Sequence, residues 1–162
     1  MGKFTNKILA EFQPPRKWKL GRDLSYTTSD LTAKEVKSLH GIGVVVIRDT
    51  NKTETITVSS GFITDLASTP RILWAFIAPF DVARAAIVHD LLYKSIRQYR
   101  WKKGLIEEDK ELIENAKKAA DKVFLLAMKD AEPKVSGWKI YSAWKAVDLF
   151  GRWSIIPNED NI

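Results

Sequence analysis

The sequence pattern changes from strand-like to helical at the stretch Gly61-Phe62-Ile63-Thr64-Asp65-Leu66-Ala67-Ser68-Thr69-Pro70-Arg71. Before it, Val44 to Arg48 is a β-branched apolar run, and Thr53 to Ser59 alternates apolar and polar residues. The two segments flank the polar turn 49–52, so they predict an antiparallel hairpin. Further short strands are expected at 18–20 and 24–27.

After this stretch the pattern becomes helical. Ser68 or Thr69 is placed to cap a short helix with Pro70 at its first position, and Asp81 is placed to cap the next one. Gly151 is a good residue to end the last helix. The longer helices are expected at 32–39, 81–98, 108–129 and 137–150.

A β-rich first part and a helical second part indicate the α+β class. We expect an N-terminal β-hairpin or small antiparallel sheet packed against three to four C-terminal helices. The 162 residues fit a single domain, 1–162. Within it, Pro14-Pro15 favours an extended N-terminal arm at 1–30, and 151–162 forms a C-terminal tail.

Composition limits the functions that need considering. The chain has no cysteine, which excludes disulfides, a thiolate nucleophile and cysteine-ligated zinc. Its net charge of +6 fits a solvated basic surface, or contact with a polyanion such as DNA. No apolar run approaches the roughly 20 residues that cross a bilayer. Glu11 and Pro14-Pro15 interrupt the N-terminal segment, so no secretory signal peptide is expected.

The candidate site centres on His89-Asp90-Leu91-Leu92-Tyr93, inside an apolar helical run. Buried polar groups cost free energy unless they are paired, so His89 and Asp90 need partners. Tyr93 lies four residues after His89, at the spacing that lets helical side chains touch. The pattern has two interpretations, a small catalytic or metal site and the polar core of a structural domain.

Two residues next to this helix are candidate partners. Asp65 is either a ligand or orienting carboxylate for His89, or a turn residue that bonds to its own backbone. Arg71 is placed to clamp Asp65, Asp90 or an anionic substrate.

A third candidate, Asp121, lies on the apolar side of the later long helix. Arg84 or His89 would supply the partner that a buried acid needs. The alternative is an exposed acid paired with Lys117 or Lys118 at helical spacing.

The motif stretch at 61–71, the Ala85-to-Tyr93 run and Ala120-Asp121-Lys122-Val123-Phe124 together resemble a phage and prophage family, domain of unknown function 1353. The resemblance covers roughly 42–150 and implies a phage gene product without implying a mechanism. The family usually has a Pro-Pro-x-Gly turn where this chain reads Ala78-Pro79-Phe80-Asp81.

The His-Asp-x-x-Tyr order also resembles the catalytic helix of secreted phospholipases A2. That resemblance implies a histidine base for a water and an aspartate that holds calcium. Those enzymes rely on disulfides, which this chain cannot form.

From these observations we expect a virion-associated or assembly component, a neck, tail or capsid accessory protein. The alternative is a small metal-assisted hydrolase using His89 and Asp90 with Asp65. In that case Ca²⁺, Mg²⁺ or Mn²⁺ would bind at Asp65, His89 and Asp90. The catalytic set would be His89, Asp90, Asp65 and Tyr93, supported by Arg71 and Asp121.

The expected partners are other phage structural proteins and further copies of the chain, with nucleic acid less favoured. The expected location is the host cytoplasm during infection, and the virion. Trp138, Tyr141, Trp144 and Val147 recur at three-residue intervals in the last helix, as in a core stripe or a docking surface.

Overall fold

The computed structural model describes residues 2–15, 17–64, 82–103, 107–132 and 134–162. The strands are β1 Lys3–Phe4, β2 Ala10–Gln13, β3 Lys17–Leu20, β4 Leu24–Thr28, β5 Val46–Arg48, β6 Glu54–Val58 and β7 Ile63–Thr64. The helices are α1 Ala33–Gly41, α2 Ala83–Lys103, α3 Glu107–Lys129 and α4 Gly137–Ser154. Small antiparallel sheets and mostly C-terminal helices confirm the predicted α+β class.

The larger sheet has the antiparallel order β1-β4-β6-β5, and its β5–β6 pair confirms the predicted hairpin. Every second side chain of β4 and β6 is buried, as expected for a sheet with one covered face. On the other face, hydroxyls pair across the strands: Thr27 Oγ1 lies 2.8 Å from Thr55 Oγ1, and Ser25 Oγ lies 2.8 Å from Thr57 Oγ1. These contacts fix the register of the two central strands.

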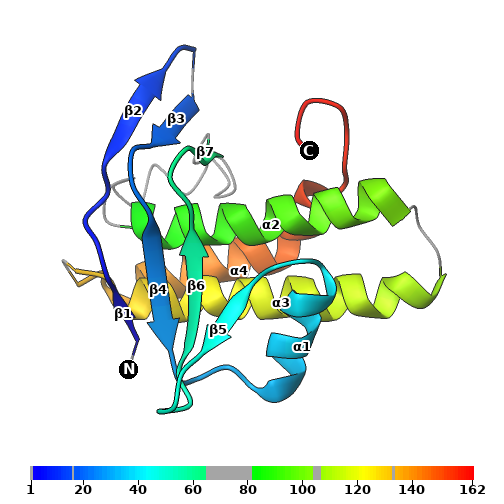
Figure 1. Ribbon diagram of the computed structural model, residues 1–162, viewed down its shortest axis with the longest axis horizontal. Coiled ribbons are helices and arrows are strands. Elements are labelled where there is room, and N and C mark those ends of the chain that lie inside the picture. The colour runs from blue at the N-terminus through cyan, green and yellow to red at the C-terminus, as the bar shows by residue number, and fades with distance from the viewer. Residues whose placement is uncertain (1, 16, 65–81, 104–106, 133) are drawn as a thin grey trace.

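The smaller sheet has the order β2-β3-β7 and stands at one end of the larger sheet (Figure 1). Its first two strands come from the segment expected as an extended arm, 1–30. Through β7 the smaller sheet also holds Thr64, the last described residue before the gap at 65–81.

The larger sheet lies in front of α2 and α3, which run antiparallel to each other, and α4 crosses behind them (Figure 1). Helix α1 begins after Thr32, whose side chain accepts from the Glu35 backbone N–H while Glu35 caps the Thr32 N–H in return. Lys122 Nζ bonds to Glu35 Oε2 at 2.8 Å and so ties α1 to α3.

One continuous core joins these layers, with fully buried side chains from β4, β6, α2, α3 and α4. Among the described residues, no helix combines the length and the hydrophobicity that crossing a membrane requires.

Two predictions about helix boundaries need comment. The prediction that Gly151 ends the last helix is wrong, because α4 continues through it to Ser154. The short helix at Pro70 and the Asp81 cap lie outside the described residues.

The buried phenol of Tyr26 joins β4 to the end of α3. Tyr26 Oη donates to Asp130 Oδ2 at 2.7 Å, and the Gly2 backbone N–H donates to the same oxygen at 2.9 Å. Tyr26→Phe should therefore lower the free energy of unfolding by about 1–3 kcal/mol, measured by urea denaturation. Tyr141→Phe is the matched control, because Tyr141 is exposed and its hydroxyl makes no such bond to another described residue. Equal stability of both variants would contradict this role.

Candidate functional site

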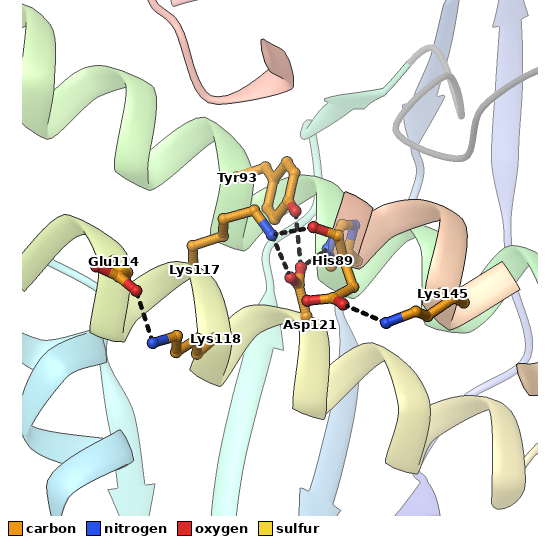
Figure 2. A network of polar contacts seen from close by, with 8 residues as sticks. His89, Tyr93, Glu114, Lys117, Lys118, Asp121 and Lys145 are labelled. Carbon is orange, nitrogen blue, oxygen red and sulfur yellow. Dashed lines mark hydrogen bonds and ion pairs between the residues drawn. The ribbon is translucent and has the colours of Figure 1, made fainter. Parts of the chain in front are cut away.

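The carboxylate of Asp121 on α3 is the centre of a buried polar cluster between α2, α3 and α4 (Figure 2). Oδ1 lies 3.2 Å from His89 Nε2 and accepts from Tyr93 Oη at 2.7 Å. Oδ2 accepts from Lys117 Nζ at 2.6 Å. Three donors from two helices therefore hold one carboxylate.

These bonds determine the ionisation of Asp121. Burial alone would raise the pKa of this carboxyl, but the hydrogen bonds from His89, Lys117 and Tyr93 lower the pKa below its ordinary value. Burial and the negative charge of Asp121 raise the pKa of the Tyr93 hydroxyl far above its usual range. Tyr93 therefore stays a protonated donor, and Asp121 stays an ionised acceptor.

The state of Asp121 in turn selects the form of the His89 ring. An ionised carboxylate can only accept hydrogen bonds, so Nε2 of His89 must carry the proton between them. In the neutral ring this leaves the lone pair on Nδ1. The ring also packs against Tyr93, with centroids 4.0 Å apart, and against Phe124 at 4.8 Å.

Lys117 links the cluster to α4 and to solvent. Its Nζ also donates to the backbone oxygen of Asp148 at 3.3 Å. A cavity of about 380 Å³ reaches Lys117 and is also lined by Glu114, Lys118, Asp148 and Arg152. The charge of Lys117 balances that of Asp121, so the cluster has no net charge while His89 is neutral.

Gly151 lets α4 approach the cluster closely. A Cβ atom on Gly151 would collide with Tyr93 Oη and lie 3.1 Å from Lys117 Cε. The glycine is thus needed for packing inside the helix, which explains why it does not act as a helix end.

Asp90 faces a different element from His89. Thr64 Oγ1 on β7 donates to Asp90 Oδ2 at 2.6 Å, and both residues are buried. Adjacent residues on a helix point about 100° apart, so His89 bonds toward α3 while Asp90 bonds toward the sheet.

The structure thus brings His89, Tyr93 and Asp121 together and places Asp90 on the neighbouring side of α2. Asp65 and Arg71 lie outside the described residues. Arg84 does not reach Asp121, because its guanidinium donates to the Glu132 backbone oxygen and stacks on Phe4.

Sequence reasoning assigned no site role to Thr64 or Gly151, and considered Lys117 only as a partner of an exposed Asp121. The i, i+4 spacing of Lys117 and Asp121 was a usable signal for that pair. Lys118 bonds instead to Glu114, on the exposed side of α3.

The predicted cation site at Asp65, His89 and Asp90 lies only partly within the described residues. Among the residues that the structure describes, no group of three or more His, Cys, Asp or Glu side chains could hold a metal ion. Nε2 of His89 bonds to Asp121. Of the two carboxylates in the predicted ligand set, Asp90 lies within the described residues and Asp65 does not.

Comparison with known proteins gave one result. The sequence model of the family described as protein of unknown function (DUF1353) matches residues 44–147, which include the strands β5 to β7 and most of the helical part. No curated protein and no solved structure matches the chain.

The close packing at Gly151 predicts a large effect of a single methyl group. Gly151→Ala should lower the free energy of unfolding by about 1–3 kcal/mol, because the added Cβ displaces Tyr93 and Lys117. Gly137→Ala adds the same methyl group to the same helix, where nothing lies within 4 Å, and should change stability by less than about 0.5 kcal/mol. Thermal melts that rank the two variants the other way would contradict this packing.

The lowered pKa of Asp121 predicts an acid-dependent loss of stability. A carboxyl with a lower pKa in the folded state stabilises the fold above its unfolded pKa, and this contribution is lost as pH falls through the folded value. Asp121→Asn should cost about 3–5 kcal/mol near neutral pH, because Lys117 loses its buried partner. The difference from wild type should shrink below about pH 4.

Urea denaturation at several pH values measures this difference. Asp148→Asn is the control, since the carboxylate of Asp148 pairs with Lys145 at a half-exposed position. A pH-independent cost of Asp121→Asn would show that its carboxylate is not ionised in the fold.

Proposed function

This chain belongs to the DUF1353 family, and we propose that it is a small hydrolase in which His89 acts as general base on a water molecule. The observation that carries the proposal is the bond between His89 Nε2 and Asp121 Oδ1, at 3.2 Å. Asp121 is itself held by Tyr93 and Lys117, so the imidazole has a fixed tautomer and orientation. A histidine base oriented by a buried carboxylate is an arrangement that recurs in enzymes using general base catalysis.

The proposed reaction is hydrolysis of a carboxylic ester. Nδ1 of His89 takes a proton from water as the water oxygen bonds to the acyl carbon. The negative charge of Asp121 stabilises the imidazolium that forms. The imidazolium then returns the proton to the departing alkoxide as the ester C–O bond breaks, which yields a carboxylic acid and an alcohol.

Water is the proposed nucleophile because the chain has no cysteine. In the described part of the chain, His89 bonds to Asp121 and to no serine or threonine hydroxyl that could serve as a nucleophile. The His-Asp-x-x-Tyr resemblance to phospholipase A2 supports the same chemistry. His89 is buried, so substrate access requires a neighbouring part of the chain to move.

Other residues take supporting roles in this proposal. Tyr93 positions Asp121, because its hydroxyl donates its proton to that carboxylate. The same hydroxyl therefore cannot donate to an oxyanion. Arg71, which the sequence places to clamp an anionic group, is the residue that we propose for stabilising the oxyanion. Asp90, with Asp65, is the proposed seat of a divalent cation, Ca²⁺, Mg²⁺ or Mn²⁺, which would polarise the ester carbonyl.

Ester hydrolysis by the purified protein tests the proposal. With a panel of nitrophenyl esters of increasing acyl length, wild type should release nitrophenol, and His89→Gln should lower the rate at least about 100-fold. His40→Gln is the matched control, because His40 is the other histidine of the chain and is exposed on α1. Circular dichroism melts verify that both variants fold.

Two results would contradict the proposal. One is a wild-type rate no higher than that of folded His89→Gln on every ester. The other is equal loss of activity in His40→Gln. Chelation with EDTA, followed by return of each cation, tests the cation separately, and an unchanged rate would remove it from the mechanism.

We also propose an assembly role in a phage, favoured by the β2–β3 hairpin. This hairpin projects from one end of the larger sheet (Figure 1), and Leu9 and Phe12 are exposed on it. In the described part of the chain β2 pairs along one edge, with β3, and an open edge is suited to pairing with another chain. The partners would be further copies or other phage structural proteins, in the host cytoplasm or the virion.

Sedimentation velocity tests the assembly role. Wild type should self-associate, and the double variant Leu9→Ser, Phe12→Ser should sediment as a monomer. Ile47→Ser removes an exposed apolar side chain from β5 instead and should leave association unchanged. A monomeric wild type would contradict association through the hairpin.

A further inference from the structure

Helix α4 has an exposed aromatic surface, which we call the α4 outer face. It consists of Trp138, Tyr141, Leu149, Phe150 and Trp153, whose side chains are 47% to 60% exposed. Most of them recur at intervals of three, four or eight residues, so they follow one side of the helix. The sequence pattern was typical of a core stripe or of a docking surface. Val147 is buried, whereas Trp138 and Tyr141 are exposed.

The opposite side of α4 is firmly attached to the protein. Ile140, Ala143, Val147 and Gly151 are buried, and the Asp148 backbone oxygen accepts from Lys117. The outer face is therefore carried by a helix that is already packed, and its exposure does not reflect a detached segment. Five large apolar side chains along one rod exceed the scattered exposure that is normal for a protein surface.

Cations flank the rings of this helix. Lys139 Nζ lies 5.9 Å from the Trp138 ring centroid, and Lys145 Nζ lies 5.6 Å from that of Trp144. The Arg152 guanidinium lies 5.6 Å from Trp153. The single acid of α4, Asp148, bonds to Lys145 at 3.1 Å. The helix thus offers a positively charged, aromatic surface to its partner.

We propose that the α4 outer face binds the surface of an anionic phospholipid bilayer. The tryptophans and Leu149 would enter the boundary between headgroups and acyl chains, where indole rings are favoured. Lys139 and Arg152 would contact lipid phosphates from the same helix. An amphipathic helix with this distribution lies in the plane of the interface and does not span it.

The shape and chemistry of the face favour a bilayer over other anionic partners. The face follows a helix of 18 residues, about 27 Å long, and a bilayer surface receives such a convex rod without a matching groove. The aliphatic Leu149, and Ile156 just beyond the helix, suit an acyl environment. Nucleic acid would use aromatic stacking and positive charge and would leave these aliphatic side chains without a role.

Vesicle co-sedimentation tests the proposal and is independent of any hydrolysis. Wild type should sediment with vesicles of phosphatidylcholine and phosphatidylglycerol, and much less with phosphatidylcholine alone. The double variant Trp138→Ala, Trp153→Ala should lower the partition coefficient at least about tenfold. Arg152→Glu should lower it roughly fivefold or more on the anionic vesicles.

Trp101→Ala is the matched control, because Trp101 is an exposed tryptophan near the end of α2, away from the α4 outer face. It should bind vesicles as wild type does. Equal binding by the double variant, no binding by wild type, or equal binding to both vesicle types would overturn the proposal. Two other results would also overturn it, if vesicles bind neither protein. One is loss of self-association by the double variant in sedimentation. The other is loss of its nucleic-acid binding in an oligonucleotide titration.

Discussion

The buried carboxylate of Asp121 is the constraint on which the helical half of this protein depends. A lone ionised carboxylate in a protein interior is very costly, and here three donors offset that cost. Each donor also fixes an element: His89 and Tyr93 hold α2 against α3, and Lys117 reaches α4 through the Asp148 carbonyl. A shift of α2 against α3 would remove two of the three donors and leave Asp121 with Lys117, on its own helix, as the remaining partner.

The same constraint gives the site its chemical character. Because Asp121 is ionised, the neutral form of His89 carries its proton on Nε2 and its lone pair on Nδ1. A structural core would be served equally well by apolar side chains of the same volume, and often better. A buried histidine whose tautomer is selected by Asp121 is what the proton transfer proposed above would use. Membership of DUF1353 identifies the family without assigning it a reaction.

Local patterns explain which parts of the fold were predictable. The alternation in Thr53 to Ser59 and the apolar run before it are local sequence patterns that predict strands, and both strands are present. The contact of His89 with Tyr93 follows from helical spacing alone. Asp121 was recognised as a candidate partner, but the choice among its partners depends on how α2 and α3 pack, which no local pattern encodes.

Gly151 and Thr64 show where local reasoning fails. A glycine near the end of a helical pattern normally indicates termination, but here the closeness of Tyr93 requires it within α4. Thr64 lies in the decisive stretch, yet its bond to Asp90 joins a strand to a helix across 26 positions of the chain. Such contacts become visible only once the layers are assembled.

The most direct measurement is the tautomer of His89, from the ¹⁵N chemical shifts of its ring in solution NMR, with His40 as the solvent-exposed reference in the same spectrum. In the neutral form of the ring, the expected result is a proton on Nε2 and the Nδ1 shift of an unprotonated nitrogen. A proton on Nδ1, or averaging between tautomers as at an exposed imidazole, would contradict the proposal that Asp121 orients His89 for base catalysis.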